Sequence, residues 1–315
     1  MKRIAFFLFL SGFLVVSLAL AQGSGTVEGD VTNGSREGKP VPGITVTLHV
    51  FDSRGIGKAS FTTVTDQEGR FSFKGLDTNK GLFYVTAVNF EGIVYRSPAL
   101  SFTEGQQKLH LPVLVYEATE RDTDVSIQKA HFIFNVDLDA GIVLVMEMYL
   151  VANNGLKTLA AGEEGSLRFP LPSGVQDFSS DTLRFEAGKA IYTLPVYPGP
   201  MPQPIVLEYS LPVQGDFFEV RRPVLYPVES YNILVTDVGL SVEVVGARMA
   251  GRIRREGKEF LNYSGEKLPK NGEISVKFAG FTKAKRIGDF GGTAAIVFAV
   301  ALALLGLLLL YIRKR

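Results

Sequence analysis

The sequence predicts an all-β protein: two β-sandwich domains in series, preceded by a signal peptide and followed by one transmembrane helix. Three observations support this prediction. Apolar and polar residues alternate along short segments, turn-forming residues separate these segments, and a long apolar run lies at each end of the chain. The chain has 315 residues, and the roughly 260 that lie between the two apolar runs suffice for two β domains.

The N-terminal end has the features of a signal peptide over residues 1–21. Three residues with two basic side chains precede an apolar run over residues 4–20, and residues 19–21 form a small-x-small cleavage sequence. The apolar run is long for a signal peptide, so an uncleaved N-terminal anchor is the alternative. The chain has no cysteine, which excludes a lipidated N-terminal cysteine, disulfides and thiolate metal ligands.

The first β domain is expected over residues 22–116. Its clearest strand carries Ile44, Val46, Leu48 and Val50 on one face and polar residues on the other, so one face packs in a core and the other is solvated. Turn pairs such as Asn-Gly and Pro-Gly separate this strand from similar ones. Short alternating strands at this spacing are typical of a sandwich.

Four motifs within residues 25–115 resemble the carboxypeptidase regulatory-like family. They occur in the family's order, as GTVEGDV (25–31), PVPGITVTL (40–48), TDQEGRFSF (65–73) and YVTA (84–87). The resemblance implies a prealbumin-like β-sandwich that accompanies other domains, belongs with folds grouped as carbohydrate-binding, and has Val27 and Val31 in an edge strand. Related collagen-adhesin B-type repeats carry an internal Lys-to-Asn crosslink. The first strand here has Glu28 and Asp30 where that lysine is expected, so the crosslink is not inferred.

A polar stretch at residues 117–124 is the expected linker, and a second β-sandwich-like domain is expected over residues 125–283. Residues 142–150 are apolar enough for a strand that is buried on both faces. Residues 194–212 contain six prolines, which is too many for a central strand, so we expect a long rigid loop or an edge strand there.

The C-terminal end predicts one transmembrane helix over residues 291–312, with a cytoplasmic tail at residues 313–315. Residues 293–312 carry no charge, and twenty helical residues span the roughly 30 Å of a bilayer core. Basic residues flank both ends equally, so the signal peptide decides the orientation, with most of the chain extracytoplasmic. The alternative is a processed tail, because Gly291-Gly292 and residues 268–272 resemble bacterial sorting signals.

Composition argues against several functions. Lys+Arg 33 against Asp+Glu 32 gives a net charge of +1, so nucleic acid is not an expected partner. The three histidines, His49, His110 and His131, are expected on outward strand faces and no His-x-x-Glu pair exists, so we expect no zinc site, no cofactor and no His-dependent hydrolase. Asn135, Asp137 and Asp139 share one strand face; calcium is an alternative there, although the usual calcium loop is missing.

Six aromatic residues around the proline-rich segment are the candidate partner-binding residues: Tyr192, Tyr197, Phe217, Phe218, Tyr226 and Tyr231. Rigid aromatic and proline side chains make a recognition surface at low entropic cost, and a place in the core is the alternative. Phe217 and Phe218 are adjacent, so in an extended chain one ring faces outward. Two basic clusters occur in this domain, Arg221-Arg222 and Arg252, Arg254 and Arg255. Alternation places Arg252 and Arg254 on one face, where we expect a solvent-exposed hairpin, and binding of a partner carboxylate or a lipid headgroup is the alternative.

These features together predict a non-catalytic binding or scaffold protein, anchored by a single span in the plasma membrane. Its bulk is expected at the cell surface or in the periplasm, and its partner is a protein or an envelope polysaccharide. The alternative is a carbohydrate-binding cell-surface module, although tryptophan, the usual sugar-stacking residue, is absent. An enzyme that uses only carboxylates is the third hypothesis, and no acid pair stands out by its spacing.

Overall fold

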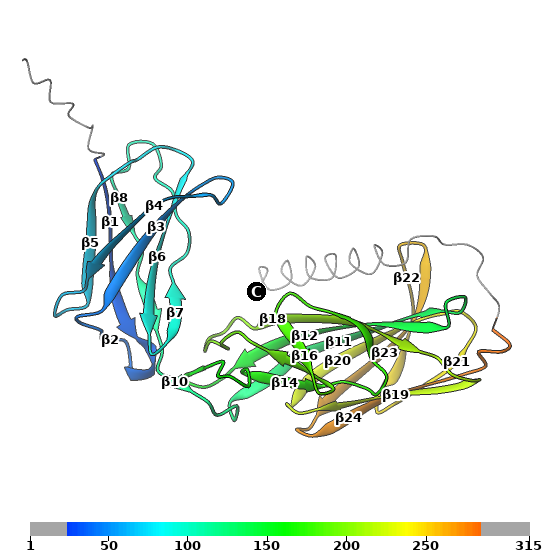
Figure 1. Ribbon diagram of the computed structural model, residues 1–315. Coiled ribbons are helices and arrows are strands. Elements are labelled where there is room, and N and C mark those ends of the chain that lie inside the picture. Colours follow the sequence, from blue (N-terminus) through cyan, green and yellow to red (C-terminus); the bar gives the residue numbers. More distant parts are fainter. Residues whose placement is uncertain (1–23, 285–315) are drawn as a thin grey trace, which may run out of the picture. The chain divides into compact units, whose positions relative to one another are not determined.

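The computed structural model describes residues 24–284, which form an all-β protein (Figure 1). The chain divides into two compact units, with the boundary between Val115 and Tyr116. The predicted signal peptide (1–21), transmembrane helix (291–312) and tail (313–315) lie outside the described residues. Within residues 24–284, no helix has the length and hydropathy that a membrane span requires.

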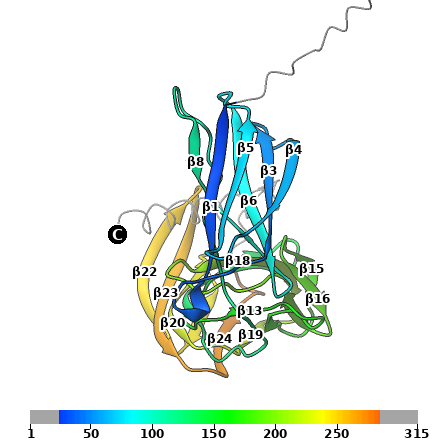
Figure 2. The same ribbon diagram turned by 90° about the vertical axis from the view of Figure 1, so that its left-hand side faces the viewer.

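Unit 1 consists of two sheets. One has the strand order β4-β3-β6-β7, and in the other β1 pairs with β2, β5, β8 and β9 (Figure 2). Side chains alternate along β1 between buried and half-buried, which places Val27 and Val31 in the core. The elements are β1 Gly25–Asn33, the 3-10 helix η1 Gly34–Arg36, β2 Lys39–Pro40, β3 Thr45–Asp52, β4 Gly57–Val64, β5 Arg70–Leu76, β6 Leu82–Phe90, β7 Ile93–Arg96, β8 Lys108–His110 and β9 Val113–Val115.

The expectation that β1 is an edge strand is wrong. β5 pairs with one side of β1 in antiparallel fashion, while β8 and β9 pair with the other side in parallel. β8 and β9, the last two strands of unit 1, therefore pair with the side of β1 that was expected to be a free edge. Backbone groups on both sides of β1 are hydrogen-bonded as a result.

Gly29 in β1 leaves room for an aromatic ring. It lies opposite Phe71 of β5 in the strand register. A Cβ atom at Gly29 would lie 2.7 Å from Phe71 Cζ and 2.7 Å from the Leu111 carbonyl oxygen. Since ordinary contacts do not come this close, the ring packs here only because position 29 has no side chain.

Unit 2 is built on a seven-stranded sheet in the order β15-β18-β12-β11-β20-β23-β22, with two three-stranded sheets, β14-β17-β16 and β19-β24-β21. β10, within the expected linker, pairs with β13. The strands are β10 Ala118–Thr119, β11 Val125–Asp137, β12 Ile142–Asn153, β13 Thr158–Leu159, β14 Leu167–Pro170, β15 Gln176–Ser179, β16 Leu183–Glu186, β17 Lys189–Tyr192, β18 Gln203–Pro212, β19 Phe217–Val224, β20 Val228–Thr236, β21 Ser241–Val245, β22 Arg248–Arg255, β23 Lys258–Leu268 and β24 Gly272–Ala279.

The main core of unit 2 lies on one face of the seven-stranded sheet, where strands of all three sheets contribute. A smaller apolar cluster of Ile133, Met146, Leu234 and Phe260 comes from four strands of the seven-stranded sheet. Alternation along the strands places this cluster on the opposite face of that sheet. β12 has buried residues on both faces, which confirms the prediction for residues 142–150.

The prediction for the proline-rich segment is confirmed for residues 194–202, which form an irregular connection between β17 and β18 with one isolated bridge at Val196, and it is wrong for the rest of the segment. Residues 203–212 form β18, which lies between β12 and β15 and is not an edge strand. Pro204 and Pro212 stand near its two ends, whereas β15 pairs only with Glu208 and Ser210 in its middle. The prolines therefore fall beyond the stretch that β15 covers, where a missing N–H group costs no bond to that strand.

Candidate binding hollow on unit 1

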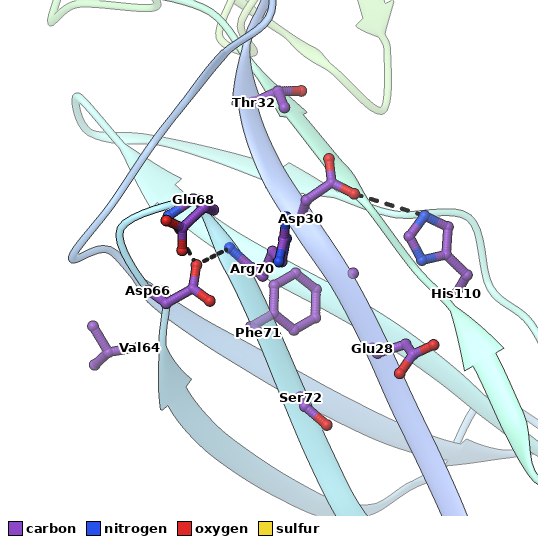
Figure 3. Close-up of a pocket in the computed structure, with 11 residues that line it drawn as sticks. Glu28, Asp30, Thr32, Val64, Asp66, Glu68, Arg70, Phe71, Ser72 and His110 are labelled. Atoms are coloured by element: carbon purple, nitrogen blue, oxygen red, sulfur yellow. Dashed lines mark hydrogen bonds and ion pairs between the residues drawn. The ribbon is translucent and has the colours of Figure 1, made fainter.

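A hollow of about 630 Å³ lies on the surface of unit 1 (Figure 3). Its walls come from β1, β5, β8 and the end of β4, together with the turn that joins β4 to β5. The lining is mostly polar and consists of Glu28, Gly29, Asp30, Thr32, Val64, Asp66, Glu68, Arg70, Phe71, Ser72 and His110.

Strand register brings the charged groups of the hollow together. Asp30 of β1 lies opposite Arg70 of β5, and Glu28 lies opposite Ser72 on one side and His110 on the other. Because alternate residues of a strand project from the same face, these side chains point away from the core that holds Val27 and Val31. Glu28 and His110 are more than eighty residues apart in the sequence, and the sheet makes them neighbours.

The turn at Asp66 holds one rim of the hollow in place. One carboxylate oxygen of Asp66 accepts hydrogen bonds from the backbone N–H of Glu68 at 3.0 Å and of Arg70 at 2.8 Å. Gly69 has φ +73°, and a Cβ atom there would lie 2.7 Å from the Val31 carbonyl oxygen. Asp66 therefore serves the turn, while Glu68 and Arg70 are the side chains that the turn positions.

The hollow carries an excess of negative charge. Four carboxylates line it, against the single guanidinium of Arg70. His110 Nε2 lies 3.7 Å from the Asp30 carboxylate, with 63% and 39% of their side chains exposed, and Figure 3 shows the two groups facing each other. Lys108 lies 3.6 Å from Glu28 at the margin. Such solvated acceptors suit a ligand that presents cationic groups or hydroxyl groups.

The six predicted aromatic residues do not share one surface. Tyr192, Tyr226 and Tyr231 are each 3% exposed and belong to the core of unit 2. Two of their hydroxyls are used inside the protein: Tyr226 accepts from the N–H of Arg168 at 3.0 Å, and Tyr231 donates to the Gly246 carbonyl at 2.8 Å. These three side chains fit the core alternative.

The other three predicted aromatics are more accessible. Phe217 is 57% exposed, while Phe218 is half-buried with its ring 6.2 Å from that of Phe278. The two neighbouring rings point in different directions, as predicted. Tyr197 is half-buried, and its backbone N–H donates to the Gln203 side chain at 2.9 Å. A role for Tyr197, Phe217 or Phe218 in binding a partner stays a prediction.

A buried polar network in unit 2 was not predicted from the sequence. Arg222 of β19 forks onto Glu147 of β12, and its Nη2 lies 2.5 Å from Glu147 Oε2. Tyr149 and Tyr209 donate to the same carboxylate at 2.5 and 2.6 Å, and Arg222 also donates to the Pro170 carbonyl. The two members of the Arg221-Arg222 cluster therefore differ, because Arg222 is buried and Arg221 is exposed.

Burial and charge set the protonation states in this network. Burial raises the pKa of Tyr149 and of Tyr209 well above the usual value, so both hydroxyls keep their protons and act as donors. Burial by itself would lower the pKa of Arg222, but the adjacent carboxylate of Glu147 raises it well above its ordinary value. The charged and polar groups of the network bind one another, so we assign the network the structural role of holding β12, β14 and β19 together.

Metal binding finds no support in residues 24–284, where no group of three or more His, Cys, Asp or Glu side chains could hold an ion. Asp137 uses its carboxylate within a turn, accepting from the N–H of Asp139 at 3.1 Å and of Ala140 at 2.9 Å. Asn135 is 8% exposed. These placements oppose the calcium alternative.

Comparison with known proteins adds no family. No protein-family model matches the chain, and a search of the curated proteins finds no match.

Proposed function

We propose that the protein is a non-catalytic binding or scaffold protein, tethered to the plasma membrane by its C-terminal apolar segment and exposed on the extracytoplasmic side. The apolar segments at residues 4–20 and 293–312 support the location, because the first suits export and the second suits anchoring. The all-β body of two units supports a display role, since such units present loops and sheet faces to partners.

The hollow on unit 1 is the single observation that supports binding. It combines an open polar surface with a rigid frame of paired strands, and its charged groups remain solvated. Solvated charged groups can exchange water for a ligand without first breaking a buried network. We propose that this hollow holds a partner that presents amino or hydroxyl groups, and that unit 1 belongs with the carboxypeptidase regulatory-like sandwiches that its four motifs resemble.

The location is tested by single-cysteine labelling, for which the cysteine-free chain is well suited. Lys74→Cys, on an exposed position of β5, is expected to react with a membrane-impermeant maleimide in intact cells. Lys314→Cys is expected to react only after the membrane is opened. The chain is also expected to stay in the membrane pellet after carbonate extraction. Recovery of the full-length chain in the cytosol, unlabelled at both positions in intact cells, contradicts the proposal.

Carbohydrate binding is the second candidate function, and the carboxylate and hydroxyl side chains of Glu28, Asp30, Thr32 and Ser72 favour it. Such groups pair with sugar hydroxyls in shallow sites. A glycan array with the full-length protein tests this function, with the Glu28→Gln/Asp30→Asn double variant as control. Sugar signals that the double variant loses favour the carbohydrate module, and an array without signals leaves the protein-binding role as the better proposal.

A further inference from the structure

Strand β4 of unit 1 has a free edge. It pairs with β3 from Thr45↔Val64 to Phe51↔Gly57 and ends the sheet order β4-β3-β6-β7. No described strand pairs with its other side. Seven of its eight residues are exposed, and Thr63 is half-buried. The outer side of β4 therefore presents a row of backbone N–H and C=O groups that only another extended backbone can pair fully.

The usual protections of an edge strand are missing from most of β4. Residues 59–64 contain no charge and no proline, and they include Phe61 and Val64, which are 44% and 57% exposed. The one charge of the strand, Lys58, lies at its start, beside a register shift, and pairs with Asp52 at 3.1 Å. Native edges are normally blunted by lysine, proline, a bulge or shortness. β4 has such features only at its first residues.

The opposite edge of the same sheet makes the contrast clear. β7 has four residues and ends at the exposed Arg96, so it is short and charged. β4 has eight residues rich in β-branched and aromatic side chains, which favour strand pairing. The β7 edge of this sheet is thus protected against pairing with another strand, and the β4 edge is not.

Charge at the two ends of β4 selects its partner. Arg54 in the turn before the strand and Lys58 at its start both pair with the single carboxylate of Asp52, which leaves a net positive end. Asp66 and Glu68 are exposed just after its last residue. Two copies of β4 that pair antiparallel bring the basic end of each copy to the acidic end of the other. Parallel pairing would instead place like charges together.

We infer that unit 1 associates with a second copy of the same chain through antiparallel pairing of the two β4 edges about a two-fold axis. The four-stranded sheets of the two copies then join into one continuous sheet. The interface is isologous, so each copy contributes the same residues. One strand pair buries little area, so the association is reversible and depends on protein concentration. The inference concerns assembly and does not depend on the ligand proposed for the hollow.

Cysteine scanning along β4 tests the pairing directly. Ser60→Cys, Phe61→Cys, Thr62→Cys and Thr63→Cys are each made in the full-length, cysteine-free chain in detergent and oxidised mildly. Disulfides need Cα atoms roughly 4.4–6.8 Å apart, so we expect a covalent dimer at the one or two positions nearest the two-fold axis and little at the others. Lys74→Cys in β5 is the control and is expected to stay monomeric. Equal crosslinking at all positions, or none, overturns the inference.

A charge-swap experiment separates β4 pairing from association through the C-terminal segment. Thr62 is exposed on β4, so Thr62→Lys and Thr62→Glu are expected to fold. Each is expected to weaken dimerisation in sedimentation by about tenfold, because the two copies of position 62 lie within a few residues of the two-fold axis and carry like charges. Mixing the two variants is expected to restore dimers. Dimers that persist unchanged in Thr62→Lys, or a mixture that stays monomeric, overturn the inference.

Discussion

Glu147 and Arg222 form a completely buried ion pair, with 0% and 1% of their side chains exposed. The pair joins the seven-stranded sheet of unit 2 to the sheet that contains β19. Tyr149 and Tyr209 complete the coordination of the carboxylate. A buried charge is tolerated only when it is paired and hydrogen-bonded, so each member of this network depends on the others.

Removing the arginine is expected to be costly. Arg222→Met leaves the Glu147 carboxylate buried without its cation, and the free energy of unfolding should fall by about 3–5 kcal/mol. Hydrogen exchange of β12 peptides in the full-length protein measures the change. The matched control is Arg221→Met, whose side chain is 65% exposed and whose loss should leave the stability nearly unchanged. Equal effects of the two variants contradict the assigned role.

Replacing both partners separates the ion pair from the packing. Glu147→Leu/Arg222→Met removes both charges together, so the double variant should regain part of the stability that Arg222→Met loses. Recovery is incomplete because Tyr149 and Tyr209 then lack their acceptor. A double variant less stable than Arg222→Met would show that the carboxylate contributes independently of the arginine.

His131 should make unit 2 less stable in mild acid. Burial, helped by the charge of Lys129, lowers the pKa of His131 from 6.5 to about 4. Between these values the unfolded chain binds a proton that the folded chain does not. The free energy of unfolding therefore falls as the pH drops from about 6.5 to about 4, by at most about 3 kcal/mol, and this contribution is constant outside that window.

The measurement compares urea unfolding of the wild type and His131→Gln across this pH window. The variant should lose less stability toward acid than the wild type. His49→Gln in unit 1 is the control and should leave the acid sensitivity of unit 2 unchanged. Identical pH profiles for the wild type and His131→Gln would show that other groups cause the acid sensitivity.

Gly29 should tolerate no side chain. Gly29→Ala places a methyl group against Phe71 and the Leu111 carbonyl, at contact distances of 2.7 Å, so unit 1 should lose about 1–3 kcal/mol. Thermal unfolding of the full-length protein measures the loss. Gly57→Ala is the matched control, because its Cβ would meet nothing within 4 Å, and it should change stability by at most about 0.5 kcal/mol.

Two carboxylates of the hollow should behave differently when they are removed. Asp66→Ala deletes the acceptor for two backbone N–H groups and should lower the stability of unit 1 by about 1 kcal/mol. Glu68→Ala should leave stability within about 0.5 kcal/mol of the wild type, because the Glu68 side chain is exposed. Thermal unfolding of both variants decides the assignment. A larger loss in Glu68→Ala than in Asp66→Ala would contradict the described turn.

Local patterns predicted much of the fold. Alternation placed Val46 and Leu48 in the core, and the apolar run at residues 142–150 indicated a strand buried on both faces. Position in a sheet could not be predicted, because it depends on strands far away in the chain. The sequence of β1 has the pattern of an edge strand, but β8 and β9 pair with its second side. The sequence of β18 has the pattern of a loop or an edge strand, but the short strand β15 pairs with its outer side.

The sites were harder to predict than the strands. In the Arg221-Arg222 pair, the side chain of Arg221 is exposed and that of Arg222 is buried. The one sequence signal for a buried cation nearby is Glu147, which lies inside the apolar run of β12. The hollow combines residues from four strands and a turn, so no contiguous motif marks it. The six aromatics share a region of the sequence, yet three of them lie in the core. Surface and core aromatics look alike when their partners are unknown.

The parallel pairing of β1 with β8 and β9 constrains how unit 1 can be made. β1 cannot complete its pairing until β8 and β9 have been synthesised, so the sheet is incomplete until the ribosome has passed Val115. A fragment that stops before Lys108 keeps one side of β1 unpaired and offers it to any neighbouring strand. Unit 1 therefore cannot complete the pairing of its first strand until residues 108–115 are available to the folding chain.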